Sequence, residues 1–267
     1  MSKGVLLFAF NNGITNYYKM AEATAKRVNH FLNLPVTLVT DKESFLTKSE
    51  YTFDNVMFVD AQTNNQKHKK LWINKGRYQA YDLTPYDETI LLDTDYLINS
   101  TQLLKLFDIY DDFMCPNKTY FLLDDNGHCQ EPISPTGFDT LWATVIAFKK
   151  SNRSKQIFEC MRMVQENYVH YVNLYNMYSS QYRNDHALAI SCRIVNGHME
   201  DKSMYIPWTL VHANNNLVVE KLSDSMYNTS YKVYKQTEKL GKTKIDYCII
   251  NDMDFHLLDK NNFMEIV

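Results

Sequence analysis

The sequence predicts an α/β fold, with a mixed, mostly parallel sheet flanked by helices. Two observations carry this prediction. Short apolar runs alternate with segments of helical spacing, and the run at 89–92 is continuously apolar, as in strands buried on both faces of a sheet. The chain has 267 residues, 45% of them hydrophobic, so a core of this size needs no disulfide or structural metal for stability.

The amino-terminal elements predict a β-α-β unit. Residues 5–10 form an apolar strand that ends in an Asn-Asn-Gly turn at 11–13, where the glycine permits a backbone conformation that other residues resist. Apolar residues then recur at helical spacing over 17–32, with Asn16 as the N-cap, and an apolar strand follows at 36–39. The sheet therefore begins with parallel strands.

The remaining elements continue the alternation of strands and helices. In the first half we expect a strand at 54–59, a polar loop at 61–70, an aromatic and basic helix over 72–81, the strand 89–92, and a helix over 100–107 capped by Ser100. In the second half we expect a long loop at 124–139, a strand at 141–148, helices at 154–171 and 184–195, a lysine-rich loop at 232–244 and a late strand at 246–250.

The strand at 89–92 leads directly into Asp93-Thr94-Asp95. Ligands of open α/β sheets bind at the carboxyl ends of the strands, and two carboxylates placed there suit Mg²⁺ or Mn²⁺ holding a diphosphate. The alternative is a solvated pair of loop acids, and a second Asp-x-Asp at 252–254 shows how common the tripeptide is. The apolar strand before the motif and the helix start after it favour the metal site, and hence an enzyme that handles a nucleotide.

Composition excludes several other classes of protein. The net charge is −3, so no global charge attracts a polyanion or an acidic membrane. Five cysteines without a Cys-x-x-Cys pair indicate neither a disulfide framework nor a zinc site. No apolar segment approaches the length of a signal or membrane-spanning segment. We therefore expect a cytoplasmic protein, in the cytoplasm of a host cell if it is viral, with no membrane partner.

Several motifs in this order resemble the GT-A nucleotide-sugar glycosyltransferases, and in arrangement the glycogenin-like members. They are Val39-Thr40-Asp41 after the second strand, Asp93-Thr94-Asp95 after the fourth, a small-residue strand at 142–148, and the late His256. The resemblance spans most of the chain and implies a single GT-A (Rossmann-like) domain, 1–267. Its nucleotide-binding half would be 1–110, and its acceptor half 111–267 would end in a segment for the metal and the diphosphate.

The resemblance also implies a metal site. Asp95 would bind Mn²⁺ or Mg²⁺, Asp93 would contact the metal or the ribose, and His256 would complete the metal shell. A neutral imidazole is a good ligand for transition metals, and Lys260 lies four residues further on, within reach of a diphosphate. The glycine that usually follows the late histidine in this family is absent, which leaves the pyrophosphate contacts open.

Further substrate-binding residues follow from the same resemblance. Asn11, Asn12, Thr40 and Asp41 fall at the ends of the first two strands, where the family binds the base and the ribose, although two asparagines there also suit an ordinary turn. Two basic residues of the helix before the motif strand, Lys75 and Arg77, are candidates for phosphate contacts, with a solvated helix face as the alternative.

Asp185 opens the helix at 184–195, where related enzymes place an acid near the donor sugar or the acceptor. In an inverting enzyme it would be the general base, and in a retaining enzyme it would hold sugar hydroxyls. An acid also simply stabilises the positive end of a helix dipole, and the sequence leaves these alternatives open.

The resulting expectation is a hexosyl- or pentosyltransferase that moves sugar from a nucleotide-sugar, a UDP-sugar above all, to an acceptor hydroxyl. The length and the Asn/Tyr/Lys-rich composition resemble bacteriophage glycosyltransferases, which implies a hydroxymethylated base in DNA as acceptor, for example by arabinosyl transfer to hydroxymethylcytosine. A glycan or protein acceptor, or a non-catalytic nucleotide-sugar-binding module, are the alternatives. A nucleotidyltransferase would need a glycine-rich basic loop after the first strand, and only Gly4 and Gly13 lie near it.

Overall fold

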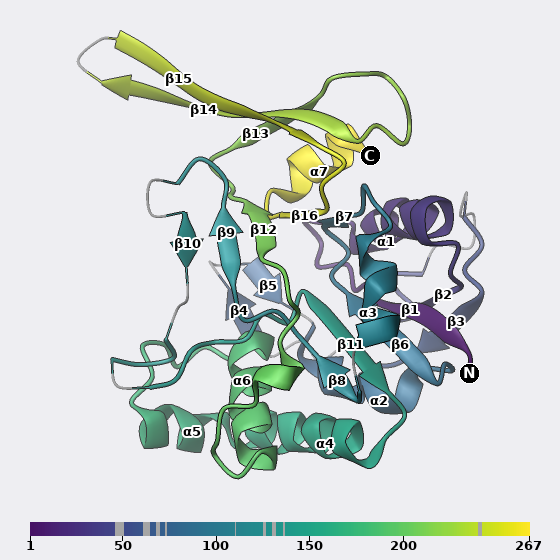
Figure 1. The fold of residues 1–267 in the computed structure, drawn as a ribbon, viewed down its shortest axis with the longest axis vertical. Helices are drawn as coiled ribbons and strands as arrows, with labels where there is room; N and C mark the ends of the chain where they lie inside the picture. Colours follow the sequence, from purple (N-terminus) through teal and green to yellow (C-terminus); the bar gives the residue numbers. More distant parts are fainter. Residues whose placement is uncertain are drawn as a thin grey trace.

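The computed structural model has a six-stranded central sheet of order β3-β2-β1-β6-β11-β8 (Figure 1). Four neighbouring strands are parallel and β11 is antiparallel to both of its neighbours, so the predicted mixed, mostly parallel sheet is confirmed. The strands are β1 (Lys3–Phe8), β2 (Val36–Thr40), β3 (Asn55–Phe58), β6 (Glu88–Leu92), β8 (Phe113–Met114) and β11 (Val145–Lys149). The structure describes residues 1–45, 51–60, 65–67, 70–72, 74–109, 111–124, 127–129, 132–135, 137–239 and 242–267.

Helices cover both faces of this sheet because successive side chains of β1 point to opposite sides. Val5 and Leu7 pack in one core cluster and Leu6 and Phe8 in the other. The first cluster includes α1 (Tyr17–Arg27), its π-helical extension η1 (Val28–Leu32), η3 (Gln102–Lys105) and α3 (Leu106–Ile109). The second includes α2 (Ala80–Leu83), α4 (Asn152–Glu166) and α6 (Asn184–Val195). None of the described helices is long and apolar enough to cross a membrane.

A second sheet meets the carboxyl end of β6. Its order is β10-β9-β12-β16-β7. It consists of β7 (Tyr96–Leu97), β9 (Thr119–Phe121), β10 (His128–Cys129), β12 (Leu210–Ala213) and β16 (Phe255–Leu257). Strand β16 is antiparallel to β7, with His256 opposite Tyr96, and parallel to β12, with His256 opposite His212. This pairing brings the carboxyl-terminal segment beside the Asp-x-Asp motif.

The carboxyl-terminal region corrects one expectation. The described residues of the lysine-rich segment 232–244, expected as a loop, lie in two long strands, β14 (Ser230–Lys239) and β15 (Lys242–Asn251). The predicted strand 246–250 is part of β15. Tyr231 and Val233, on either side of Lys232, are buried on one face of this hairpin. The hairpin extends from the body of the protein in Figure 1. The edge strand β13 (Val218–Lys221) and the helix α7 (Lys260–Ile266) complete this region.

The segment before β6 is less helical than predicted. The strand β4 (Asn65–Lys67) lies within the expected loop 61–70, of which residues 61–64 and 68–69 lie outside the described residues. It pairs with β5 (Lys70–Trp72), which begins at the last residue of that loop and ends at the first residue of the expected helix. The helix expected over 72–81 is a 3-10 turn, η2 (Lys75–Gln79), followed by the single turn α2. Its first turn contains Gly76 and has no side-chain cap, both of which weaken an α-helix.

Other elements differ mainly at their boundaries. The helix predicted at 184–195 is α6, and the Asn16 side chain caps α1 by accepting from the Lys19 N–H at 3.0 Å. The Ser100 Oγ accepts from the Gln102 N–H at 3.1 Å, and the helix expected at 100–107 begins as the 3-10 turn η3 and becomes α-helical only at Leu106, in α3. The helix expected at 154–171 is broken at Asn167 into α4 and α5 (Tyr168–Tyr175), the strand expected at 141–148 begins at 145, and the long loop holds β10. A short 3-10 turn, η4 (Lys202–Met204), follows α6.

Candidate metal and nucleotide site

The backbone around the Asp-x-Asp motif is fixed by contacts with distant segments. The Asp93 N–H donates to the Thr144 carbonyl at 3.0 Å, which ties the end of β6 to the segment before β11. The Leu257 N–H donates to the Asp95 carbonyl at 3.1 Å, which ties the turn after β6 to β16. Both aspartates therefore lie where the two sheets meet.

Asp93, Asp95 and His256 form a group whose ligand atoms all lie within 4.8 Å of one another. The His256 Nε2 lies 2.9 Å from the Asp95 Oδ2 and 4.0 Å from the Asp93 Oδ2. The side chains of Asp95 and His256 are each 7% exposed and that of Asp93 is 26% exposed, so the group opens to solvent on the Asp93 side. The predicted ligand set is thus brought together from positions 161 residues apart.

Lys260 joins this group from the first turn of α7, where its Nζ makes an ion pair with the Asp95 Oδ2. Burial on its own would raise the pKa of Asp95, but the contacts with His256 and Lys260 outweigh burial and hold that pKa well below its usual range. Burial lowers the pKa of Lys260, and the attraction of Asp95 reverses this and raises it overall. The carboxylate and the ammonium group are therefore both charged at neutral pH.

Arg77 lies under the site and not at its surface. Its guanidinium makes an ion pair with the Asp93 Oδ1 and donates from Nη2 to the Ala143 carbonyl at 2.6 Å, and its side chain is 2% exposed. These contacts favour an anchoring role for Arg77 over the phosphate contact expected from the sequence. Lys75 lies two residues earlier, half-buried at the start of η2.

The segment formed by Ala143 and Thr144 links Asp185 to the same site. The Ala143 N–H donates to the Asp185 Oδ1 at 2.9 Å, while its carbonyl receives the bond from Arg77. The Asp185 Oδ2 also accepts from the Arg183 Nη2 at 3.0 Å. Asp185, in the first turn of α6, and Arg77, which holds Asp93, therefore bind the same residue, Ala143, one through its N–H and the other through its carbonyl.

Sequence reasoning missed His212, a fully buried histidine of β12. Its Nδ1 lies 3.1 Å from the Nδ1 of His256, and its ring packs against Phe121 and Trp142 at centroid distances of 5.0 and 4.5 Å. Burial, and next the neighbouring His256, lower the pKa of His212 well below 6.5, so the ring is neutral at neutral pH. A histidine inside the apolar run Leu-Val-His-Ala was the available signal.

Two more residues at this site were not expected from the sequence. The Thr144 Oγ1 lies 3.4 Å from the His256 Nδ1. Tyr17 stands close enough to Lys260 and Asp95 for both charges to act on its phenol, whose pKa burial raises. Neither residue type carries a sequence signal for such a position.

The residues predicted to bind the base and ribose lie at the carboxyl ends of β1 and β2, where their side-chain oxygens make hydrogen bonds within residues 9–44. The Asn11 Oδ1 accepts from the Tyr18 N–H at 3.1 Å, and the Asn12 Oδ1 accepts from the Ile14 and Thr15 N–H groups at 3.1 and 2.8 Å. The other bonds are from the Thr40 Oγ1 to the Ala9 carbonyl at 2.6 Å and from the Ser44 N–H to the Asp41 Oδ1 at 2.6 Å. The oxygens of Asn11, Asn12 and Asp41 therefore support the segments after these strands, whereas the Thr40 hydroxyl links the end of β2 to the end of β1.

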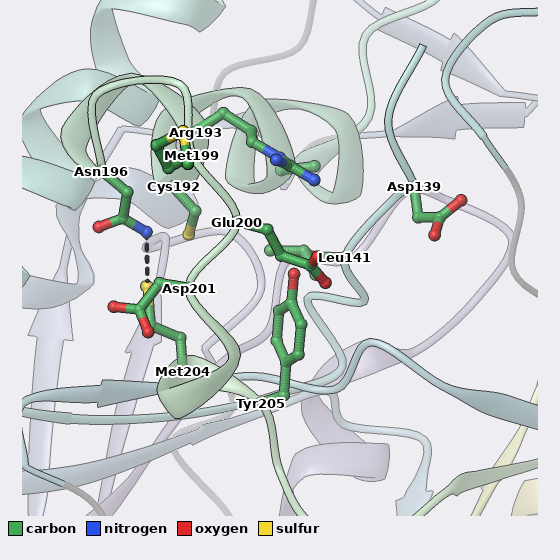
Figure 2. A pocket seen from close by; sticks show the side chains of 11 residues that line it. Asp139, Leu141, Cys192, Arg193, Asn196, Met199, Glu200, Asp201, Met204 and Tyr205 are labelled. Carbon is green, nitrogen blue, oxygen red and sulfur yellow. Dashed lines mark hydrogen bonds between the residues drawn. The ribbon is translucent and has the colours of Figure 1, made fainter. Parts of the chain in front are cut away.

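A surface pocket lies elsewhere, between the carboxyl-terminal half of α6 and the segment 199–205 (Figure 2). Arg193 and Asn196 line it from the helix, and the Asn196 Nδ2 donates to the Met204 Sδ at 3.0 Å. Arg193 is eight residues beyond Asp185, about 12 Å along the helix axis. This pocket is therefore separate from the acidic group formed by Asp93, Asp95 and His256.

No protein-family model matches the sequence, and no curated protein matches it. Solved structures overlap with the fold at low identity. GlyE of Streptococcus pneumoniae TIGR4, a glycosyltransferase, has a TM-score of 0.43 and 13% identity over 81% of this chain and 46% of its own, so this chain spans about half the length of GlyE.

Two further overlaps are similar in extent. The galactosyltransferase LgtC, in complex with donor and acceptor sugar analogs, has a TM-score of 0.44 and 15% identity over 71% of this chain and 70% of its own. Mouse xyloside xylosyltransferase 1 has a TM-score of 0.46 and 10% identity over 74% of this chain and 84% of its own. At these TM-scores and identities the overlaps concern the fold and do not identify the reaction.

Proposed function

We propose that this protein is a metal-dependent glycosyltransferase that moves a sugar from a nucleotide-sugar to an acceptor hydroxyl. One observation carries the proposal. Two strand-end aspartates converge with His256 and Lys260, from 161 and 165 residues away, at the carboxyl edge of a mostly parallel sheet. Such an edge is where open α/β sheets bind ligands, and its charges suit a cation and a diphosphate together.

The residues present fit a divalent cation. Ligands held at about 2.1 Å by an octahedral ion lie about 3 to 4 Å apart, and the His256 Nε2 is 2.9 and 4.0 Å from the two carboxylate oxygens. Asp93, Asp95 and His256 would hold the ion, and the imidazole nitrogen favours Mn²⁺ over Mg²⁺. When bound, such an ion supplies Lewis acidity toward a diphosphate leaving group.

Lys260 would stabilise the charge that develops on the departing diphosphate. Its side chain is 26% exposed and its ammonium group pairs with the Asp95 carboxylate, so the charge is already held beside the place where the phosphates would lie. A preorganised charge in a partly dehydrated site acts more strongly on the transition state than the same charge in water. Lys260 would thus act directly on the substrate, whereas Arg77 would keep Asp93 in place.

Asp185 would act on the sugar or on the acceptor. Both of its oxygens accept hydrogen bonds, from Ala143 and Arg183, which orient the carboxylate. This arrangement supports the binding of sugar hydroxyls, as expected for a retaining enzyme, more than the uptake of a proton as a general base. Asn11, Asn12, Thr40 and Asp41 would border the base and ribose from the ends of β1 and β2.

The finer assignments rest on the sequence resemblance. It supports a UDP-sugar as donor and hydroxymethylcytosine in DNA as acceptor. A glycan or protein acceptor, or nucleotide-sugar binding without turnover, are the competing functions. Metal-dependent release of the nucleotide separates a transferase from a binding module, and stimulation by an acceptor identifies the acceptor class.

The test is release of nucleotide from a panel of UDP-sugars and other nucleotide-sugars with Mn²⁺, with and without hydroxymethylcytosine DNA. We expect Asp95→Asn to lower the rate at least about 100-fold, because it removes a ligand of the Lewis acid. Asp252→Asn is the matched control: it makes the same chemical change at the exposed first aspartate of the second Asp-x-Asp, a residue with φ of 50°, a conformation that asparagine tolerates. If the wild type neither releases nucleotide nor binds any donor with metal dependence, the proposal is wrong.

A further inference from the structure

His212 and His256 are direct neighbours in two parallel strands. They face each other in the register of β12 and β16, and their Nδ1 atoms are 3.1 Å apart. His212 is fully buried and His256 is 6% exposed, so water has little access to the space between the rings. Two nitrogens at this distance form a hydrogen bond only when one of them carries a proton and the other a lone pair.

The direction of this bond follows from the role of the opposite ring nitrogen. The His256 Nε2 faces Asp93 and Asp95 and must present its lone pair to bind a cation. The proton of a neutral His256 is then on Nδ1 and needs an acceptor. His212 Nδ1 is at 3.1 Å, whereas the Thr144 Oγ1 is at 3.4 Å.

We propose that His212 is a positioning residue for the metal site, which accepts a hydrogen bond from His256 Nδ1–H and so fixes the tautomer and the orientation of the metal-binding ring. The inference rests on the proposed function, because it concerns a ligand of the proposed cation. Metal-bound histidines generally donate their second ring N–H to such an acceptor, and losing it weakens metal binding.

Packing alone does not account for a histidine at this position. The ring is stacked on Phe121 with an interplanar angle of 23° and tilted against Trp142, surroundings in which phenylalanine would bury the same shape without polar atoms. The His212 Nε2 is buried and has no hydrogen-bond partner among the described residues. Burial of an unpaired polar atom costs about 1–3 kcal/mol, so the bond made by Nδ1 is what a histidine adds here.

The test compares two substitutions of the same residue. His212→Phe keeps the stacked ring and removes the acceptor, whereas His212→Asn places an amide oxygen near the position of Nδ1. We expect His212→Phe to raise the Kd for Mn²⁺ at least about 10-fold, and His212→Asn to restore most of the affinity. Mn²⁺ binding is followed by electron paramagnetic resonance of the free ion, without any substrate. Thr144→Val is the control for the more distant oxygen and should leave the Kd nearly unchanged.

Nitrogen NMR of the Mg²⁺-loaded protein, labelled in its histidines, gives a second readout. We expect a single Nδ1–H tautomer for His256 in the wild type and a loss of that preference in His212→Phe. Equal Mn²⁺ affinity of His212→Phe and wild type would overturn the inference alone, and so would equal losses in the Phe and Asn variants, which indicate packing. A wild type that binds no Mn²⁺ would overturn the proposed function as well.

Discussion

Two polar regions lie at the carboxyl edge of the central sheet, and they are built in different ways. The turns after β1 and β2 are held by hydrogen bonds within residues 9–44. The Asn12 Oδ1 accepts from N–H groups two and three positions on, and the Thr40 hydroxyl donates to the Ala9 carbonyl across the two strand ends. The acidic group at Asp93 and Asp95 depends on partners from three other segments, η2, β16 and α7. Only the second region needs the whole chain to be folded.

This difference indicates what each region contributes. Polar side chains that bond to adjacent N–H groups stabilise the turn that carries them. Where the turn is exposed, water largely replaces these hydrogen bonds when the side chain is removed. The charges of the acidic group stabilise no local turn, because they lie on separate elements and are partly removed from water. Such an arrangement costs desolvation free energy, which is typical of a site retained for binding.

The largest effect is expected from Arg77. Arg77→Met removes the partner of Asp93 and of the Ala143 carbonyl, and should lower the free energy of unfolding by about 3 kcal/mol, the lower end of the range for buried pairs because Asp93 is partly exposed. Denaturant unfolding of the metal-free protein measures it. Lys75→Met, in the same short helix, should stay within about 0.5 kcal/mol. Equal effects would mean that the contacts of Arg77 with Asp93 and Ala143 do not stabilise the fold.

A pH effect of similar size is expected at the junction between the end of β7 and the start of β16, where the Asn99 N–H donates to the Asp254 Oδ1 at 2.7 Å. Burial raises the pKa of Asp254 from 3.8 to about 6. Because the folded value is the higher one, the stabilisation by Asp254 is fully present below about pH 4 and is lost as the pH rises through 6. Asp254→Asn removes this dependence, so its stability relative to wild type should rise by about 3 kcal/mol between pH 4 and pH 8.

Thermal or denaturant unfolding across this pH range, on metal-free protein, measures the difference. Asp252→Asn serves as the control because Asp252 is exposed and should show no such trend. Parallel stability curves for wild type and Asp254→Asn would show that the junction tolerates a charged carboxylate.

A smaller, ligand-dependent effect is expected from Lys260, which is bonded to the same Asp95 oxygen that faces His256. Lys260→Met should strengthen Mn²⁺ binding without nucleotide up to about 10-fold, because a competing positive charge is removed. It should weaken binding of the nucleotide-sugar by about 10-fold, because a phosphate partner is lost. Calorimetric titrations with each ligand test both directions, with Lys260→Arg as a charge-preserving control. Weaker binding of both ligands would mean that Lys260 only holds Asp95 in place.

The sequence was sufficient to predict the parts of the molecule that have a local pattern. The strand before Asp93 and the helix Asn184–Val195 are marked by continuous apolar residues and by helical spacing. The late strand 246–250 was predicted, but its pairing with β14 was missed, because the polar and lysine residues around the buried Tyr231 and Val233 give that segment the composition of a loop.

The site itself was only partly predictable, for a related reason. Asp93 and Asp95 follow a recognisable strand, and His256 and Lys260 were proposed from the family resemblance. His212 depends on the register between β12 and β16, strands 44 residues apart, which no local pattern encodes. The burial of Arg77 under Asp93 likewise follows from how η2 packs on the segment before β11.

The smallest effect is expected from Asn12, in the turn after β1. Asn12→Ala removes the oxygen that accepts from the Ile14 and Thr15 N–H groups, and should lower the free energy of unfolding by about 1 kcal/mol, since Ile14 is exposed and water can replace the bond. The Kd for Mn²⁺ should not change, because none of these bonds reaches the acidic group. Denaturant unfolding and the Mn²⁺ titration measure the two quantities on the same sample. A weaker Mn²⁺ affinity would show that the two regions are coupled, and that the turn after β1 helps to hold the acidic group as well as its own backbone.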